Sequence, residues 1–382
     1  MVLARTAQEG RGIRSLTGVR GVAAVWVLSF HLQQNAGRVW GLSWLQGARV
    51  LERGWSGVDL FFVLSGFILM HAHGQDFSRI RVTPCWRFAK LRVVRVYPLS
   101  AVVLLLILAL VRADTGFAVW YQGLAAGNLS LEAFVRTLFL ATRWFLPGVG
   151  DWNQPVWSLS AEVLGYAAFP FVGFFLLQCR SFWTALLVGS VSLEVLAGAQ
   201  FLLHSAASNE FGQISAVVRM ALCFLAGAAF NRARRLAPSE LLSCSSFPTI
   251  VALSMVAVSV ASRQTAILSP LAYSTLIFVL SFERGFINHI FSSTPIFFLG
   301  RISFPLYLFH VMPLLWLQYH IAGRGLPEWL VVTILGGYIV ACLLAATLLH
   351  YAVEKPCHAL GRWTSQRPGS GSKLVVAAVE ST

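Results

Sequence analysis

Long apolar runs dominate this chain, and short polar segments separate them. Each run extends over about 16–24 residues, long enough or nearly long enough to cross a bilayer core as an α-helix. Polar and apolar positions do not alternate with period two, as they do in the strands of a membrane barrel. The pattern predicts an all-α polytopic membrane protein with about ten transmembrane helices, at residues 16–35, 57–73, 96–112, 157–178, 182–203, 214–231, 247–262, 265–282, 295–319 and 328–352.

Two parts of the chain are less regular. The runs 247–262 and 265–282 are separated by a three-residue polar stretch, Ser-Arg-Gln, so their division into two helices is the weakest of the set. The segment 113–156 is rich in Trp and Phe but holds no complete spanning run. We expect it to rest on the membrane surface or to cover a cavity, with an extra re-entrant helix around 131–146 as an alternative.

Composition supports the membrane assignment. Of the 382 residues, 57% are hydrophobic and 12% are charged, against about 25% charged residues in soluble domains. The net charge of +14 comes from Lys and Arg in the short loops, where positive charge sets the orientation of membrane proteins. No pattern for binding nucleic acid is present. The charge therefore predicts topology and excludes a nucleic-acid partner.

The distribution of charge predicts the orientation. With the N-terminus inside, eighteen Lys and Arg residues lie on the inner side and seven on the outer side, which favours an N-in, C-in arrangement. We expect a cytosolic segment at 1–14, a transmembrane domain at 15–357 and an unstructured cytosolic tail at 358–382. The first run lacks a cleavage site of the A-x-A kind, so we interpret it as an uncleaved helix.

The six cysteines do not indicate a metal site. None forms a CxxC pair, and no cluster of His and Cys has the spacing of metal ligands. We interpret them as small buried residues or free thiols, and we expect no metal.

The first apolar run, SLTGVRGVAAVWVLSFHL, contains Arg20 and His31. At 100° and 1.5 Å per residue they share one helix face, about 16 Å apart along the axis. An ionisable side chain at that depth is costly and normally faces the bundle interior or water. Alone, Arg20 could extend to the headgroups and His31 could make an interhelical hydrogen bond. Their common face favours one polar track.

Two carboxylates lie near the outer ends of other predicted helices. Asp59 lies in the first turn of the run GWSGVDLFFVLSGFILM, where an anion suits the helix dipole. Alternatively, it could hydrogen-bond to one ring nitrogen of His31 and leave the other nitrogen free as a base. Glu162, in WSLSAEVLGYAAFP, lies about one turn inside the outer end of its helix and needs water or a partner there.

Two further stretches carry polar side chains on one face. In WRFAKLRVVRVYPL, Arg92 and Arg95 are three residues apart and share a helix face. They could bind phosphates. Alternatively, they could bind anionic lipid or only set the orientation of the chain in the membrane. In LGRISFPLYLFH, Ser303, Tyr307 and His310 form a stripe at i, i+4 and i+7, for which interhelical hydrogen bonding is the alternative.

Together these stretches resemble the membrane-bound acyltransferase 3 family, bacterial enzymes that O-acylate surface polysaccharides and some small molecules. The resemblance covers about residues 15–357. It is carried, in the family's order, by LTGVRGVAAVWVLSFH, GVDLFFVLSGFIL, RFAKLRVVRVYP, WSLSAEVLGYAAFP, ISFPLYLFH and VEKP. One departure is visible, because the family has Leu-Asp-Gly ahead of the arginine where this chain has Thr17. We expect the threonine to keep the helix cap, whereas a donor-binding role of that aspartate is put in doubt.

The resemblance implies roles for individual residues. Arg20 and His31 match the family's R-x10-H motif, and Arg92 and Arg95 match its R-x-x-R motif. Glu354 matches its closing motif, although ordinary solvation at the cytosolic surface would also explain a glutamate there. The expected catalytic residues are His31, Asp59 and Glu162; the expected donor contacts are Arg20, Arg92, Arg95 and Glu354; the expected substrate contacts are Tyr307 and His310.

The expected activity is O-acetyl transfer. Acetyl-CoA, as co-substrate, would approach from the cytosol, and His31 would act as general base on an acceptor hydroxyl or would itself carry the acyl group. The expected acceptor is an exopolysaccharide or its lipid-linked repeat unit, with an antibiotic or signalling oligosaccharide as alternative. The expected location is the bacterial cytoplasmic (inner) membrane, with membrane lipid and polysaccharide-assembly proteins as candidate partners. A transporter or flippase of lipid-linked sugars, and a membrane sensor, are the rival functions.

Overall fold

The computed structural model is helical throughout the part of the chain that it describes. That part comprises residues 12–34, 39–45, 47–124, 127–144, 151–206, 213–238, 246–261 and 268–365. Within these ranges there is no strand, and one isolated bridge joins Gly127 to Asp151. The all-α prediction is confirmed.

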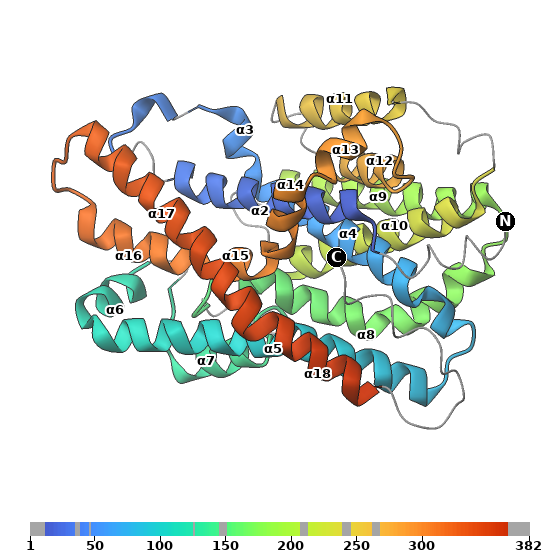
Figure 1. Ribbon diagram of the computed structural model, residues 1–382, viewed down its shortest axis with the longest axis horizontal. Helices are drawn as coiled ribbons and strands as arrows, with labels where there is room; N and C mark the ends of the chain where they lie inside the picture. Colours follow the sequence, from blue (N-terminus) through green and yellow to red (C-terminus); the bar gives the residue numbers. More distant parts are fainter. Residues whose placement is uncertain are drawn as a thin grey trace.

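The long helices run along the long axis of the molecule or cross it obliquely (Figure 1). They are α2 (Arg14–Gln34), α4 (Gly57–His73), α5 (Val82–Ala113), α8 (Val156–Gln178), α9 (Phe182–Ala206), α10 (Gln213–Leu236) and α17 (Glu328–Leu349). Shorter elements join them: η1 (Ser43–Leu45), α3 (Arg49–Glu52), η2 (Gly54–Ser56), η3 (Gly74–Phe77), α6 (Thr115–Gln122), α7 (Leu131–Leu138), α11 (Phe247–Ala261), α12 (Ser269–Leu280), α13 (Phe286–Phe291), α14 (Thr294–Arg301), α15 (Ser303–Phe309), α16 (Val311–Ile321), η6 (His350–Glu354) and α18 (Lys355–Ser365).

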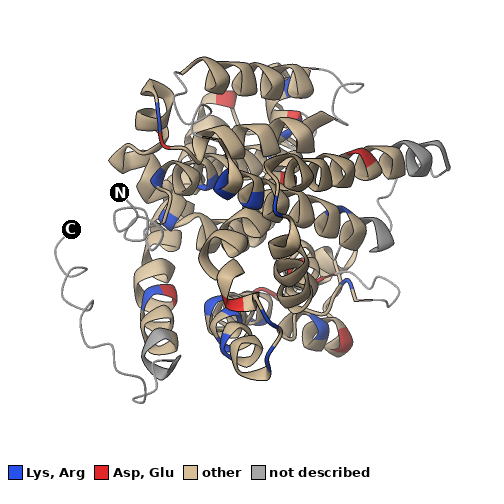
Figure 2. Ribbon diagram, turned by 90° about the vertical axis from the view of Figure 1, so that its right-hand side faces the viewer, with Lys and Arg blue, Asp and Glu red and all other residues tan. Residues whose placement is uncertain are grey.

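Within the described residues, seven helical segments are long and apolar enough to cross a membrane, and an eighth span results if α14 is counted together with the helices that follow it. Two further apolar helices, α11 and α12, have 15 and 12 residues. Figure 2 shows how sparsely Lys, Arg, Asp and Glu occur along the helices. The chain is therefore a multi-pass membrane protein, while the count of ten crossings and the N-in, C-in orientation stay predictions.

The centre of the bundle is formed by α2, α4, α8 and α10, which bury one large apolar cluster. Helices α4 and α10 approach closely at Gly227, where a Cβ atom would lie 1.9 Å from the Val63 carbonyl oxygen. Small residues permit such close contact between membrane helices, whose packing depends on van der Waals contact. The close packing fixes the position of α4, which carries Asp59.

The expected span at 295–319 is not one continuous helix, and whether its parts cross the membrane as a single span stays a prediction. Helix α14 ends at Arg301, and the following helical stretch, Ser303–Ile321, is bent away from it by 52°. Pro305 supplies the physical reason, because proline has no N–H for the carbonyl four residues before it and its ring collides with that carbonyl. That carbonyl belongs to Arg301, the residue at which α14 ends.

Three other boundaries differ from the prediction. Helix α5 begins at Val82, ahead of the predicted run at 96–112, so the basic stretch that contains Arg92 and Arg95 belongs to the same helix. Thr17 lies inside α2, where its hydroxyl donates back to the Ile13 carbonyl at 3.4 Å, and it does not cap the helix. The tail expected to be unstructured from residue 358 begins as α18, which packs on α5 and extends to Ser365. A helix, α7, lies where the alternative placed a re-entrant helix at 131–146, but it ends at Leu138, and its relation to the membrane stays a prediction.

Candidate active site

A first cavity lies beside the N-terminal half of α2 and has a volume of about 270 Å³. Its charged and polar lining brings together residues from five helices, α2, α4, α5, α8 and α15: Thr17, Arg20, Ser65, Arg92, Arg95, Ser158, Glu162, Tyr166, Ser303 and Tyr307. Most of the remaining lining is apolar. The structure thus brings together three predicted donor contacts and one predicted catalytic carboxylate in a single hollow.

The break between α14 and α15 positions Arg20. Its guanidinium Nη2 donates to the Gly300 carbonyl oxygen at 2.8 Å, and the Ser303 hydroxyl donates to the same oxygen, also at 2.8 Å. Such bonds fix a long side chain that would otherwise sample many rotamers. Arg20 therefore faces the cavity and does not extend along lipid.

Arg92 is held by a short relay at the end of α4. Its Nη2 lies 3.4 Å from His73 Nε2, and His73 Nδ1 lies 3.2 Å from the Asp76 carboxylate. The guanidinium also stands over the Phe88 ring, 5.5 Å from its centre. Because the carboxylate accepts the Nδ1 proton of His73, Nε2 is left as an acceptor for the arginine.

Glu162 lies among these arginines. It accepts a hydrogen bond from the Ser65 hydroxyl, and its charge acts on Arg20 and Arg92. It lines the first cavity and is absent from the lining of the cavity that holds His31. Its expected catalytic role stays a prediction, and its position is that of a counter-charge for the arginines.

Glu354 lies behind the cavity, at the end of the π-helical turn η6. Its carboxylate accepts from His350 Nδ1 at 2.7 Å, and the charges of Arg95 and Arg20 act on it. Arg301 Nη2 lies 3.3 Å from the other ring nitrogen of His350. Glu354 is buried, so ordinary solvation does not explain it. Its expected contact with the donor stays a prediction, since it does not line the cavity.

The second cavity lies beside the C-terminal half of α2 and has a volume of about 400 Å³. Its lining combines aromatic rings with amide and guanidinium donors: Phe30, His31, Gln34, Trp55, Arg143, Gln154, Trp157, Arg219 and Tyr307. Among the lining residues that the structure describes there is no carboxylate. The cavity therefore offers hydrogen-bond donors and flat apolar faces.

The partners of two histidines determine which ring nitrogen carries each proton. His310 Nδ1 lies 3.1 Å and 2.9 Å from the Leu306 and Tyr307 carbonyl oxygens, so Nδ1 carries the proton and Nε2 is an acceptor. His31 Nδ1 lies 2.9 Å from the Val27 carbonyl oxygen and 3.2 Å from His310 Nε2, two acceptors. His31 Nδ1 must therefore donate, which leaves Nε2 unprotonated, and the ring lines the second cavity.

The expected pairing of Asp59 with His31 is not what the structure contains. The Asp59 carboxylate accepts two hydrogen bonds from Arg219 of α10, one of them from Nη2 at 2.6 Å. Asp59 is 1% exposed and Arg219 is 6% exposed, and the guanidinium stands 4.7 Å from the centre of the Trp55 ring. A bidentate arginine satisfies a buried carboxylate better than one imidazole N–H does. The histidine that contacts His31 is His310.

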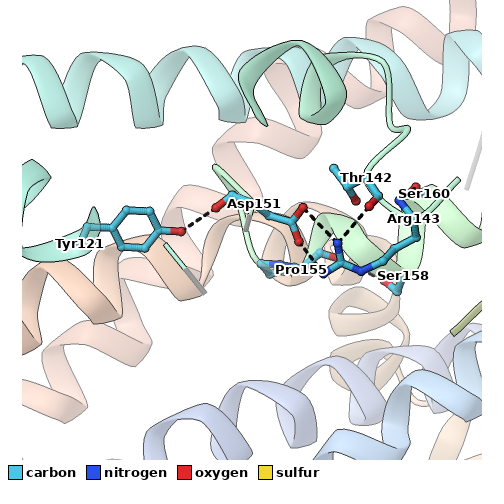
Figure 3. A network of polar contacts seen from close by, with 7 residues as sticks. All are labelled: Tyr121, Thr142, Arg143, Asp151, Pro155, Ser158 and Ser160. Carbon is cyan, nitrogen blue, oxygen red and sulfur yellow. Dashed lines mark hydrogen bonds and ion pairs between the residues drawn. The ribbon is translucent and has the colours of Figure 1, made fainter. Parts of the chain in front are cut away.

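A second arginine–carboxylate pair borders the same cavity, on the segment before α8. Arg143 Nη2 donates to the Asp151 carboxylate at 2.9 Å, and the Tyr121 hydroxyl donates to the Asp151 carbonyl at 2.8 Å (Figure 3). The Arg143 backbone N–H donates to the Ser160 hydroxyl. Burial raises the pKa of Asp151 to about 6, although the charge of Arg143 opposes the shift.

The two cavities meet inside the bundle. Among the described residues, Val58 of α4 and Tyr307 of α15 line both of them. Arg20 lines the first cavity and not the second, whereas His31 lines the second and not the first. The predicted polar track thus consists of two chambers with a common wall.

Three site residues were missed in the sequence. Arg219 is the single charged residue within the run 214–231, and an ionisable residue inside a span is a functional candidate by default. Arg143 and Ser158 carried no comparable signal, because their positions depend on tertiary contacts. No group of three His, Cys, Asp or Glu side chains within the described part of the chain forms a metal site.

Comparison with known proteins places the sequence in a family. A family model described as an acyltransferase domain, Acyl_transf_3, matches residues 13–351. "O-acetyltransferase OatA" of Staphylococcus aureus is 23% identical over 386 residues, covering 92% of this chain and 58% of its own length. "Protein 2 in picA locus" of Rhizobium radiobacter is 32% identical over 162 residues, 40% of this chain and 78% of that protein. "Acyltransferase MdmB" of Streptomyces mycarofaciens is 32% identical over 162 residues, 41% of this chain and 38% of that protein.

Fold and site therefore define a multi-pass membrane enzyme that transfers acyl groups. The chain belongs to the acyltransferase 3 family, because the family model covers most of its length. The chain spans 58% of the length of the staphylococcal relative and 38% of the Streptomyces one. No solved structure matches the chain.

Proposed function

We propose that this protein is an O-acetyltransferase of the bacterial inner membrane. It takes the acetyl group from cytosolic acetyl-CoA and transfers it to a hydroxyl of a carbohydrate, an exopolysaccharide or its lipid-linked repeat unit. The chain is oriented N-in and C-in, so the first cavity opens towards the cytosol. The observation that carries the proposal is the meeting of an arginine-lined cavity and a histidine-lined cavity at Val58 and Tyr307.

The first cavity suits the donor. Arg20, Arg92 and Arg95 present guanidinium groups, which bind phosphates through charge-assisted hydrogen bonds. The apolar remainder of the lining suits the uncharged arm that carries the thioester. The donor then reaches the shared wall with its phosphates held near the arginines and its thioester foremost.

The second cavity suits a sugar. Trp55 and Trp157 offer flat apolar faces, and Gln34 and Gln154 offer donors to hydroxyl oxygens. Cavities that bind small molecules combine such apolar walls with a few convergent polar groups. An acceptor bound there places a hydroxyl near His31 Nε2.

The chemistry uses the free ring nitrogen. His31 Nε2 takes the proton of the acceptor hydroxyl while the hydroxyl oxygen attacks the thioester carbonyl carbon. The new C–O ester bond forms, the C–S bond breaks, and the proton passes from His31 to the departing thiolate of coenzyme A. His310, uncharged, holds His31 in the tautomer that this step needs. The alternative mechanism is a two-step transfer through an acyl-His31 intermediate. Parallel lines in double-reciprocal plots of the steady-state kinetics would reveal it.

The test of the acceptor uses cells with and without the gene. We expect mass spectrometry of their surface glycans to detect O-acetyl groups that disappear with the gene and return with the wild-type copy but not with a His31→Ala copy. Unchanged glycan acetylation would contradict the proposed acceptor. Transport of lipid-linked sugar across proteoliposomes without any thioester consumption would favour the transporter function instead.

Removing either donor-side arginine should weaken donor binding. We expect Arg92→Ala and Arg95→Ala to raise the KM for acetyl-CoA roughly 10- to 100-fold, because a hydrogen bond to a charged group contributes about 1.5–3 kcal/mol. The measurement is thiol release from acetyl-CoA by purified protein in nanodiscs. Arg87→Ala is the matched control, an exposed arginine of α5 that does not line the cavity. A rise in the acceptor KM alone would show that the donor site is misassigned.

The pair formed by Arg143 and Asp151 predicts a pH dependence. Above about pH 6 the Asp151 carboxyl is ionised and balances Arg143, whereas below that pH it is protonated and the charge balance is lost. The other polar groups that face this aspartate are Thr142 and the Tyr121 hydroxyl. We expect the KM for acceptor glycan purified from the producing cells to rise as pH falls below about 6.

Asp151→Asn should remove that pH dependence. The variant mimics the protonated form at every pH, so its acceptor KM should be higher at pH 7.5, about tenfold for the loss of one charge-assisted hydrogen bond, and flat between pH 5 and pH 7. Glu132→Gln is the control, since that glutamate pairs with Arg136 on α7, away from the cavity. A wild-type curve that matches the Asp151→Asn curve would contradict the assignment.

A further inference from the structure

We propose that Val58 and Tyr307 form a constriction that limits the size of the acyl group which this enzyme transfers. The inference rests on the proposed function, because it concerns the point at which the thioester from the first cavity meets the hydroxyl in the second. It assigns acetyl as the preferred group and names the residues that exclude longer ones.

The geometry of the shared wall is the first observation. Val58 and Tyr307 line both cavities and are 6% and 9% exposed. His31 lines the second cavity alone, and the donor-side arginines line the first alone. A carbonyl carbon that is attacked by a hydroxyl next to His31 must therefore lie at this wall. The hydrocarbon end of the acyl group is then confined beside the same two side chains.

The backbone beneath Val58 cannot retreat. The preceding residue, Gly57, starts α4 against α2, and a Cβ atom on it would lie 2.9 Å from Val27 Cγ2 and 3.4 Å from the Ala23 carbonyl oxygen. Such a close contact leaves no room for the first turn of α4 to move towards α2. The isopropyl group of Val58 is thus a fixed part of the wall.

Tyr307 is fixed by contacts with two other helices. Its hydroxyl lies 2.7 Å from the Ser158 hydroxyl of α8, and its ring stands edge-on to Phe61 of α4 with ring centres 5.6 Å apart. Ser158 in turn donates to the Pro155 carbonyl at 3.1 Å (Figure 3), so the tyrosine donates its own proton to Ser158. Rotating the ring away would break this chain of hydrogen bonds and uncover a buried polar pair.

Rigid apolar walls discriminate strongly by size. Interiors are close-packed, so an additional methylene has to displace side chains that have no free space behind them. In a fixed apolar pocket one methylene changes kcat/KM about 10- to 200-fold. Acetyl, with a single methyl group beyond the carbonyl, is the acyl group that such a wall disturbs least.

The experiment compares acetyl-CoA, propionyl-CoA and butyryl-CoA as donors. Thiol release by the full-length protein in nanodiscs is measured with water as acceptor, so no assumption about the glycan is needed. We expect kcat/KM of the wild type to fall at least tenfold with each added methylene. We expect Val58→Ala to raise the butyryl-to-acetyl ratio of kcat/KM at least tenfold.

Val58→Ile provides the opposite change and should lower the propionyl-to-acetyl ratio. It also keeps the proposal testable if the alanine variant fails to fold. Val63→Ala is the matched control, the same substitution in a buried residue of α4 that lines neither cavity. The donor ratios of this control should equal those of the wild type.

The outcomes separate this inference from the proposed function. A wild type that uses butyryl-CoA as well as acetyl-CoA, or Val58 variants with unchanged donor ratios and retained acetyl-CoA turnover, would overturn the constriction and leave the acetyltransferase in place. The proposed function would instead be overturned if the wild type consumed none of the three thioesters in nanodiscs and the gene left the O-acetylation of the cells' glycans unchanged.

Discussion

His31→Ala should lower the turnover number for acetyl transfer by about 10²- to 10⁴-fold, the range that a positioned general base contributes. The ring accepts the acceptor proton at Nε2 because Nδ1 donates to the Val27 carbonyl and to His310. Alanine supplies no base, and the other described groups that line the cavity are guanidiniums, amides, a phenol and apolar side chains. Single-turnover transfer from labelled acetyl-CoA in nanodiscs measures the effect.

Two further variants make the result specific. His31→Gln keeps a polar side chain of similar size but cannot accept a proton at neutral pH, so it should be as inactive as alanine. His320→Ala is the matched control, because that imidazole pairs with Asp114 and lines neither cavity. Retention of wild-type turnover by His31→Ala, with the protein folded in the membrane, would exclude the mechanism.

The helical architecture could be predicted because it follows from local composition. A run of sufficient length without charge has to be helical in lipid, where every backbone group must be satisfied internally. Each predicted run contains a helix, and the run 57–73 coincides with α4. The break in the run 295–319 was missed, because Pro305 ends or bends a helix according to what surrounds it, and the length criterion ignores proline.

The shared face of Arg20 and His31 could also be predicted, since helical geometry alone decides it. The partners of the carboxylates could not. Asp59 was expected beside His31, whereas its actual partner, Arg219, comes from a helix whose neighbours the sequence does not specify. The division into two cavities is likewise a property of packed side chains.

The buried pair of Asp59 and Arg219 leads to the second large effect, a loss of stability. Asp59→Ala or Arg219→Ala should destabilise the folded protein by about 3–5 kcal/mol, because each leaves the other charge buried without its partner. Asp59→Asn should behave similarly, since the neutral amide does not balance the guanidinium. Thermal unfolding of the purified protein in detergent measures the effect. The two side chains are 1% and 6% exposed, so solvent cannot replace the lost partner.

The double variant Asp59→Leu with Arg219→Met decides whether the pair or either charge alone is needed for folding. Two apolar side chains of similar volume leave no buried charge, and replacing a buried ion pair in this way is often neutral or stabilising by about 1–4 kcal/mol. The melting temperature should therefore return to the wild-type value or exceed it. If Asp59 instead fixed the tautomer of His31 directly, Asp59→Asn would lose turnover and keep its melting temperature. His310 would then not be the partner that fixes this tautomer.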